Sequence, residues 1–335
     1  MLTPPRISVI IPVFNGRRFL RAAVLSVLAQ SLPPCEVLVV DDGSTDDSLT
    51  ELEDMSPAPW RLRVLRQANA GQSAARNLAA RNAEGEYLAF LDQDDVWHPL
   101  HLETLVAPLV ADSSAGWAHC DFDEIDLEGN LVTRAFLRSR NVIHPKQTVF
   151  DCVAADLMVP PSASVLRKAA FEDVGGFDET LSGYEDDDLF VRFFRRGWDQ
   201  VFIDRALTRF RVHGAGSTAS PRFIDSRLRY AQKLAATLPD DPRMLRFYVA
   251  NAIAPRFFLT SLDDYVRACS ARDWHGARLI LATVNHFAHL RRPGLRLRWK
   301  LFWIQRPRLF RLLIALNDCL PSRVRFIRNP AVTLR

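Results

Sequence analysis

Residues 7–16 have the sequence ISVIIPVFNG, and this stretch decides the fold of the chain. Nearly every position from Ile7 to Val13 is β-branched or apolar, which predicts a strand that is buried on both faces. The turn Phe14-Asn15-Gly16 ends this strand. Because strands buried on both faces are typical of parallel sheets covered by helices, we expect an α/β fold.

The same pattern continues through the first hundred residues. Further buried strands are predicted at 36–40, 61–66 and 87–91, with helices between them at 17–30, 46–55 and 72–82. This alternation indicates a single, mostly parallel sheet flanked by helices. The pattern after residue 100 is looser, and we expect mixed strands from about 116 to 213. Near residues 217–222 glycine becomes scarce and arginines accumulate, and helical periodicity there indicates a C-terminal helical appendage.

The composition is that of an ordinary globular protein, with 335 residues, 48% hydrophobic and 24% charged, and a net charge of +4. The five cysteines are far apart and form no CxxC pair, which argues against a disulfide framework and a cysteine-based zinc site. The sequence has no signal-peptide pattern and no apolar run long enough to span a membrane, so we expect a cytoplasmic protein.

Polar side chains follow three of the predicted strands. They are Asn15, the pair Asp41 and Asp42, and the cluster Asp92-Gln93-Asp94-Asp95. In α/β sheets ligands bind beyond the carboxyl ends of the strands, where these residues come together. Asp92 and Asp94 alternate and can face a hard divalent ion, although a solvated acidic turn or a helix cap is the alternative. Asp41 and Asp42 can accept hydrogen bonds from a uracil-like base or from ribose, or can cap the turn.

Seven segments, taken in order, resemble the consecutive motifs of family-2 glycosyltransferases. They are SVIIPVFNG (8–16), VVDDGSTD (39–46), NAGQSAARN (69–77), FLDQDD (90–95), GGFDE (175–179), EDDDL (185–189) and RVH (211–213). The resemblance covers roughly residues 7–217, and the shared order makes it specific. It implies a GT-A-type, Rossmann-like fold and the transfer of a sugar from a nucleoside-diphosphate sugar, with inversion at the anomeric carbon.

The resemblance also implies the residues of the donor side. Those expected to contact the donor are Pro12, Asn15, Asp41, Asp42, Arg76, Asp92 and Asp95. Asp41 and Asp42 would hold the base and ribose of a donor, with UDP or dTDP favoured, and Arg76 would lie near the diphosphate. Asp92-Gln93-Asp94 matches the DxD element, in which Asp92 and Asp94 bind Mg²⁺ or Mn²⁺ and Gln93 is a spacer. Asp95 would contact the metal or the sugar, and His213 can complete the metal shell.

An inverting transfer needs a carboxylate that takes the proton of the acceptor hydroxyl. Asp186 matches this catalytic base, and Glu185 would orient it or the acceptor. Both lie where a helix is predicted to begin, and the helix dipole favours the ionised form there. The alternative is that these acids only serve the first turn of the helix. Family members commonly carry an aromatic residue in place of Asp187, which leaves Asp186, Asp187 and Asp188 as candidates.

We therefore predict a catalytic domain at 1–218, with a nucleotide-sugar-binding half at 1–100 and an acceptor-side half at 101–218. A helical, basic region follows at 219–335. Residues 291–311 are rich in arginine and aromatic residues and contain no acid, which favours contact with a membrane surface; packing on the catalytic domain is the alternative, and nucleic acid is not expected. A peripheral place on the inner face of the cell membrane would suit a lipid-linked acceptor in bacterial surface-polysaccharide assembly.

Other classes of protein fit the sequence less well. A sugar nucleotidyltransferase needs a glycine-rich, basic phosphate loop, which PVFNGRR (12–18) does not supply. A non-catalytic nucleotide-sugar-binding protein would not need acids at every expected position. No GxGxxG follows Val13, which argues against a dinucleotide-dependent dehydrogenase. The sequence also lacks a QxxRW element, which favours a single addition to a carbohydrate or lipid-linked acceptor over processive synthesis.

Overall fold

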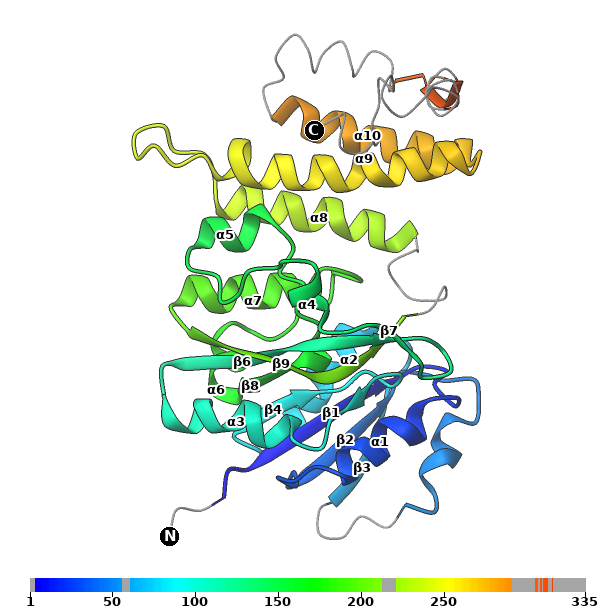
Figure 1. The fold of residues 1–335 in the computed structure, drawn as a ribbon, viewed down its shortest axis with the longest axis vertical. Coiled ribbons are helices and arrows are strands. Elements are labelled where there is room, and N and C mark those ends of the chain that lie inside the picture. Colours follow the sequence, from blue (N-terminus) through cyan, green and yellow to red (C-terminus); the bar gives the residue numbers. More distant parts are fainter. Residues whose placement is uncertain are drawn as a thin grey trace. The chain divides into compact units, whose positions relative to one another are not determined.

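The computed structural model describes residues 4–55, 61–212 and 221–290, together with residues 305, 306, 308, 310–312 and 315 (Figure 1). The chain divides into two compact units. The first comprises Met1–Val149 and Leu157–Ser226, and the second comprises Phe150–Asp156 and Arg227–Arg335. The predicted domain boundary at 218 lies just before helix α8 (Pro221–Thr237), and the division between the units falls inside that helix.

The first unit is built on one sheet. Its strands are β1 (Ile7–Val13), β2 (Glu36–Asp41), β3 (Arg61–Arg66), β4 (Tyr87–Phe90), β5 (Val96–Trp97), β6 (Ala115–Ile125), β7 (Leu131–Thr133), β8 (Ser164–Arg167) and β9 (Asp199–Arg211). Its helices are α1 (Leu20–Leu28), α2 (Gln72–Asn82), α3 (His101–Ala111), α4 (Phe136–Ser139), α6 (Lys168–Asp173) and α7 (Glu185–Arg196), whereas α5 (Val149–Ala154) lies in the second unit except for Val149. The short 3₁₀ turns η1 (Ser48–Leu52) and η2 (Pro161–Ala163) complete it.

The strand order is β3-β2-β1-β4-β8-β6-β9-β5, with β7 paired to β6. Strands β1 to β4 are parallel to their neighbours within this group, as the buried apolar runs predicted. β8 then runs antiparallel to both β4 and β6, and β9 runs parallel to β6, which is the mixed half expected after residue 100. The chain adds β2 and β3 on one side of β1 and β4 on the other, and ligands bind at such switch points.

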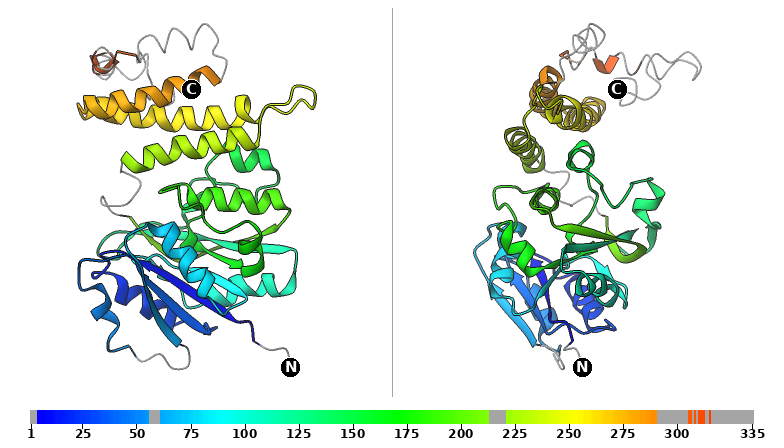
Figure 2. Two further views of the ribbon diagram at one scale, coloured as in Figure 1. Left: turned by 180° about the vertical axis from the view of Figure 1, so that it is seen from behind. Right: turned by 90° about the vertical axis from the view of Figure 1, so that its left-hand side faces the viewer.

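Helices cover both faces of the parallel half. Val9 and Ile11 of β1 are fully buried in one cluster with α1 and α3. Seen from behind, α2 lies on the opposite face of the sheet (Figure 2). Its buried side chains are mostly small, and small side chains allow a helix to approach a sheet closely. Because helices cover both faces of the sheet, β1 is apolar at nearly every position.

One predicted helix is shorter than expected. The pattern predicted a helix at 46–55, whereas the structure forms only the 3₁₀ turn η1. Asp46 Oδ1 accepts the N–H of Ser48 at 3.1 Å, a local side-chain bond that competes with helical backbone bonding. The segment is therefore a capped turn that leads away from the carboxyl end of β2.

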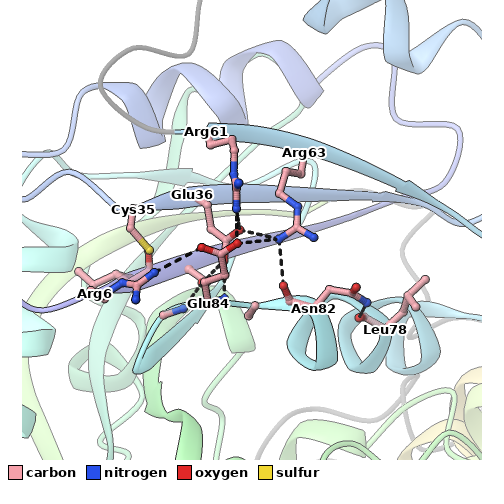
Figure 3. A network of polar contacts seen from close by, with 12 residues as sticks. Arg6, Cys35, Glu36, Arg61, Arg63, Leu78, Asn82 and Glu84 are labelled. Atoms are coloured by element: carbon pink, nitrogen blue, oxygen red, sulfur yellow. Dashed lines mark hydrogen bonds and ion pairs between the residues drawn. The ribbon is translucent and has the colours of Figure 1, made fainter.

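A polar network joins the amino ends of the strands (Figure 3). Glu36 is buried, and its Oε1 accepts from Ser8 Oγ at 2.7 Å and from the Glu84 N–H at 2.6 Å. Arg63 Nη1 lies 2.9 Å from Glu36 Oε2. Glu84 itself is half exposed and pairs with Arg6 and Arg61 at the surface. The network lies at the edge of the sheet opposite the carboxyl ends.

The second unit is helical, as the C-terminal sequence pattern predicted. It contains most of α8, the π-helical turn η4 (Val249–Ile253), α9 (Ala254–Ser270) and α10 (Trp274–Leu290). Phe257 packs against Tyr230 and Phe287, with ring centroids 5.9 and 5.7 Å away. No helix within the described residues has the length and apolarity to cross a membrane. Most of the basic stretch 291–311 lies outside the described residues.

Candidate active site

The sheet is open between β1 and β4 at its carboxyl edge. The Ile10 carbonyl accepts the Leu91 N–H at 2.9 Å, after which the chain leaves β4. Pro12 is buried in β1, and its backbone is directed toward the β4 side, like that of Ile10. Because β4 has already ended there, the missing N–H of Pro12 costs no bond to a neighbouring strand. The Gln93 amide takes the next position, accepting from the Phe14 N–H at 2.9 Å and donating to the Phe14 carbonyl at 3.1 Å. Gln93 therefore fixes the DxD segment to the end of β1.

The loop after β2 is fastened to Asn15. This residue has a left-handed backbone with φ of 50°, which asparagine tolerates better than most residues. Its Oδ1 accepts the N–H groups of Thr45 at 2.8 Å and Asp46 at 3.3 Å, and its own N–H donates to Ser44 Oγ at 3.0 Å. Asp41 Oδ1 accepts the Ser44 N–H at 2.9 Å, and its side chain stays partly exposed. Asn15 thus shapes the loop, and a ligand can reach Asp41.

Asp42, by contrast, is turned inward and buried. Its Oδ1 accepts from Gln67 Nε2 and from the Ala70 N–H, both at 2.8 Å, and its Oδ2 accepts the Gly71 N–H at 2.8 Å. Gly71 has a φ of 92°, a conformation that favours glycine, and it precedes α2. The resemblance gave Asp42 a part in nucleoside binding. In the structure its carboxylate organises the turn that starts α2.

Arg76 of α2 is buried and bridges two acids. Its Nη2 lies 2.5 Å from Asp92 Oδ1, and its Nη1 lies 3.1 Å from Glu185 Oε1. The guanidinium also lies over the Phe177 ring, 5.3 Å from the centroid. Burial alone would lower the pKa of Arg76, but the charges of Asp92 and Glu185 outweigh it, and the net pKa lies above the ordinary value. One permanent cation therefore joins the DxD segment to the first turn of α7.

Asn77, the next residue of α2, holds the glycine turn at 175–177. Its Oδ1 accepts the Phe177 N–H and its Nδ2 donates to the Phe177 carbonyl, both at 2.9 Å. Gly176 has a φ of 74°, and a Cβ there would lie 2.7 Å from Asn77 Oδ1. Only glycine fits this approach without displacing the amide. Asn77 thus fixes the backbone of Phe177, and the ring of Phe177 lies beneath the Arg76 guanidinium.

The acids at the start of α7 have different surroundings. Glu185 is buried against Arg76 and Gln72, and burial raises its pKa despite the Arg76 charge. Asp187 is buried and its Oδ1 accepts the Leu157 N–H at 2.9 Å. Asp188 is buried and pairs with Arg192 Nε at 2.8 Å. Asp186 is the member of the run whose side chain is partly exposed, and its Oδ1 accepts the Asp187 N–H at 2.8 Å.

Asp95 is buried as well. Its Oδ1 accepts the Arg211 N–H at 2.8 Å, and Oδ2 has no hydrogen-bond partner among the described residues. Burial, followed by the charges of Asp94 and Asp92, raises the pKa of Asp95 well above its ordinary value. Arg211 Nε donates to the Asp94 carbonyl at 2.8 Å. The resemblance assigned Asp95 to the metal or the sugar, whereas the structure places its carboxylate in the interior, where it ties the DxD segment to β9.

Asp92 and Asp94 of the DxD segment are the predicted ligands of a divalent ion, and carboxylate oxygens are ligands that such ions accept. Burial is the first cause of the raised pKa of Asp95, and the charges of Asp94 and Asp92 add to it; a cation beside these acids would offset the charge contribution. Within the described part of the chain, no three His, Cys, Asp or Glu side chains are grouped to hold a metal ion. Mg²⁺ at nucleotide sites is commonly held by one or two carboxylates plus substrate phosphates. His213, predicted to complete the shell, lies outside the described residues.

Ser162 belongs to this site, although the sequence gave no signal for it. The residue is buried in η2, and its Oγ accepts the Asp92 N–H at 3.0 Å. Its carbonyl accepts from Trp97 Nε1 at 2.6 Å and from Thr208 Oγ1 at 2.9 Å. One residue thus fixes the start of the DxD segment together with β5 and β9. The preceding Pro160-Pro161 pair predicts only a stiff turn, not its place beside Asp92.

These features coincide with a match to a known family. Residues 8–175 match the model of glycosyl transferase family 2. The chain belongs to glycosyltransferase family 2. An uncharacterized family relative, a glycosyltransferase of Rickettsia conorii, is 30% identical over 220 residues, which make up 65% of this chain and 35% of that protein. This chain therefore spans about a third of the length of that relative.

Solved structures share the fold of this family member. TarS 1-349 from S. aureus, in complex with UDP-GlcNAc, has a TM-score of 0.61 at 19% identity, over 91% of this chain and 89% of that one. The mannosyltransferase PcManGT from Pyrobaculum calidifontis, in complex with GDP-Man and Mn²⁺, has a TM-score of 0.56 at 20% identity, over 95% and 89%. These likenesses confirm the predicted GT-A-type fold, and the family model confirms the predicted family.

Proposed function

We propose that this chain transfers a sugar from a nucleoside-diphosphate sugar to a hydroxyl group and inverts the anomeric carbon. One observation carries the proposal: buried Arg76 joins Asp92, the first acid of the DxD segment, to Glu185, which directly precedes Asp186. Donor-side and acceptor-side acids are therefore held on one cation. Such an arrangement fits a reaction in which a diphosphate leaves near one acid while a second acid activates the attacking hydroxyl.

Asp186 is the proposed general base. Its carboxylate is partly exposed at the first turn of α7, while Glu185, Asp187 and Asp188 are buried and engaged with other groups. The Asp187 N–H donates to Asp186 Oδ1 and the helix dipole adds to this, so the ionised form is favoured. The carboxylate takes the proton of the acceptor hydroxyl as the hydroxyl oxygen attacks the anomeric carbon. The bond from that carbon to the diphosphate then breaks, and the product has the opposite configuration.

Asp94 and Asp92 would hold Mg²⁺ or Mn²⁺ together with the phosphates of the donor. When bound, the ion neutralises charge that develops on the leaving diphosphate. Support comes from the charges of Asp94 and Asp92, which add to the effect of burial on the pKa of Asp95, and PcManGT, a protein of similar fold, has been solved with Mn²⁺ and a nucleotide sugar. His213 follows the described end of β9 and stays a proposed ligand.

The donor and acceptor are proposed by class. Asp41, which a ligand can reach, is the proposed partner of the base or ribose, and the sequence favours UDP or dTDP. The two solved neighbours contain different bases, UDP-GlcNAc and GDP-Man, so they support a nucleotide-sugar donor without choosing its base. The proposed acceptor is a carbohydrate or a lipid-linked glycan of bacterial surface-polysaccharide assembly. The enzyme would add one sugar to each acceptor at the inner face of the cell membrane, with residues 291–311 in contact with the membrane surface.

The loop after β1 argues against a sugar nucleotidyltransferase. Such an enzyme needs backbone N–H groups that cradle phosphates. Here the N–H groups of residues 14–17 donate to side chains, namely Gln93, Ser44, Ser48 and Asp46. This loop is therefore closed by the protein's own oxygens and offers no phosphate cradle.

A thermal-shift panel tests the proposal. Full-length protein is heated with UDP-, dTDP- and GDP-sugars, each with and without Mn²⁺. A donor present at about 100 times its Kd stabilises the folded state by about 2.7 kcal/mol. We expect one base to stabilise the protein only when Mn²⁺ is present, and we expect Asp94→Ala to abolish that shift. If no nucleotide sugar of the panel shifts the melting temperature with or without Mn²⁺, the proposed function is wrong.

A further inference from the structure

The backbone of Leu157 is held from both sides in the acceptor half. Its N–H donates to Asp187 Oδ1 at 2.9 Å, and its carbonyl lies 2.9 Å from His144 Nε2. His144 Nδ1 in turn lies 3.2 Å from His119 Nε2 on β6. The Asp187 N–H donates to Asp186 Oδ1. Hydrogen bonds therefore lead from β6 to the proposed base, and they are linked through the backbone of Leu157 and through Asp187. We call this series of residues the histidine relay: His119, His144, Leu157, Asp187 and Asp186.

The hydrogen positions in the histidine relay follow from its partners. A carbonyl can only accept, so His144 Nε2 must carry the proton that it donates to Leu157. Neutral His144 then accepts at Nδ1, and His119 Nε2 must donate to it. His119 Nδ1 is left without a hydrogen, and it has no partner among the described residues. Burial lowers the pKa of His144 to about 4 and holds the pKa of His119 well below its ordinary value, so both rings are neutral at pH 7.

Aromatic packing holds the start of the histidine relay in place. His119 is fully buried and stacks on Trp117, with centroids 4.9 Å apart. Trp117 also stacks on Phe190 of α7, with ring centroids 4.1 Å apart. Phe202 lies against both histidines, at 5.3 and 5.4 Å. The helix that carries Asp186 is thus tied to β6 by stacked rings and by the histidine relay.

We propose that His144, oriented by His119, is a positioning residue that sets the place and basicity of Asp186 through the backbone of Leu157 and through Asp187. The inference rests on the proposed function, because Asp186 is the base only if the chain performs that transfer. The alternative is that the two histidines only pack against α7 and have no effect on Asp186. The two readings differ in what happens when the ring is kept and its hydrogen bonds are removed.

The test compares His144→Phe with His144→Gln in the full-length chain. Phenylalanine keeps an aromatic ring against Phe202 but cannot bond to Leu157, whereas the glutamine amide can donate to the Leu157 carbonyl. The assay measures hydrolysis of UDP-GlcNAc and GDP-mannose with Mn²⁺, with water in place of the acceptor. We expect His144→Phe to lower kcat at least tenfold with an unchanged Kd for the donor, and His144→Gln to recover most of it.

A pH profile adds a measurement that simple packing would not move. In His144→Phe the Asp187 N–H should be less well oriented toward Asp186, and this should raise the pKa of the acidic limb of kcat, because the bond favours ionised Asp186. His119→Phe should shift the limb in the same direction, which covers the case in which His144→Phe does not fold.

Two results would overturn the inference. They are a kcat of His144→Phe within twofold of wild type, or a kcat of folded His144→Gln as low as that of His144→Phe. Absence of binding and turnover in the wild type with every UDP-, dTDP- and GDP-sugar of the thermal-shift panel would instead remove the proposed function and this inference with it. Wild-type turnover that disappears in Asp186→Asn but persists in His144→Phe removes the inference alone.

Discussion

The side-chain amide of Gln93 pairs with both backbone polar groups of Phe14, at 2.9 and 3.1 Å. The amide continues the hydrogen bonding of β1 beyond the point where β4 leaves the sheet. The acids on either side of Gln93 are therefore held at fixed positions relative to β1. In the proposed function these acids hold the metal and the donor phosphates, and a displacement of about 1 Å in such a group lowers the activity of an enzyme.

Gln93→Leu removes both hydrogen bonds while keeping the volume. Two bonds of about 1 kcal/mol each order the DxD segment, so we expect the Mn²⁺-dependent affinity for the donor to fall by up to about thirtyfold. Gly16→Ala should act similarly without changing the segment, because a Cβ at Gly16 would lie 2.2 Å from Gln93 Oε1. Calorimetric titration of UDP with Mn²⁺ measures both variants. Wild-type affinity in both would show that the pairing does not position the acids.

Arg76→Met should destabilise the fold and abolish turnover. The change leaves Glu185 buried without its cation, and breaking a buried pair in this way costs about 3–5 kcal/mol. Urea unfolding and donor hydrolysis measure the two effects. Arg81→Met is the matched control on the same helix, since its side chain is 64% exposed and lies 4.0 Å from exposed Glu179. The control should change the free energy of unfolding by less than about 0.5 kcal/mol; equal effects of the two variants would refute the bridging role.

Local sequence patterns predicted the parallel half of the sheet and the gathering of acids at its carboxyl edge. They succeeded because burial on both faces constrains every residue of a strand such as β1. They could not predict which acids point inward. Asp42 and Asp95 look like their neighbours in sequence, but their orientation depends on N–H groups from distant segments, such as that of Arg211 on β9. The roles of Gln93 and Ser162 likewise depend on partners about seventy or more residues away.

Asp186→Asn should lower turnover by about 10²- to 10⁴-fold, because an amide cannot take the proton of the attacking hydroxyl. The Kd for UDP with Mn²⁺ should stay at the wild-type value, since the residue faces the acceptor side in the proposed reaction. Asp178→Asn is the isosteric control, because an amide oxygen still accepts the Thr180 N–H. Donor hydrolysis at saturating substrate separates the two variants. Full activity of Asp186→Asn would assign the base elsewhere in the run 185–188.

Glu36→Ala should destabilise the protein without changing turnover per folded molecule. Glu36 is buried and holds Ser8, the Glu84 N–H and Arg63 at the amino ends of the strands (Figure 3). The proposed site lies at the carboxyl ends. We expect a loss of about 3 kcal/mol in the free energy of unfolding. Glu84→Ala removes only half-exposed ion pairs and should cost less than about 1 kcal/mol. Similar losses of unfolding free energy in both variants would mean that the buried position of Glu36 adds nothing to the stability of the fold.

Acid should destabilise the wild type more steeply than His144→Gln. The pKa of His144 is lowered to about 4 in the folded protein, first by burial and then by the charge of Lys146, while an unfolded histidine titrates near pH 6.5. Between these values the unfolded state binds one more proton. The stability contributed by neutral His144 is therefore complete above about pH 6.5 and is lost as the pH falls toward 4.

The size of the effect follows from that single proton. His144→Gln should reduce the slope of unfolding free energy against pH by about 1.4 kcal/mol per pH unit in this window. His101 and His119 remain in the variant, and their lowered pKa values leave a residual slope of the same sign. Urea unfolding at pH 7.5, 6.0 and 5.0 gives both slopes. Parallel curves for wild type and variant would mean that His144 titrates alike in the folded and unfolded states, and that the ring is not the buried neutral donor the histidine relay requires.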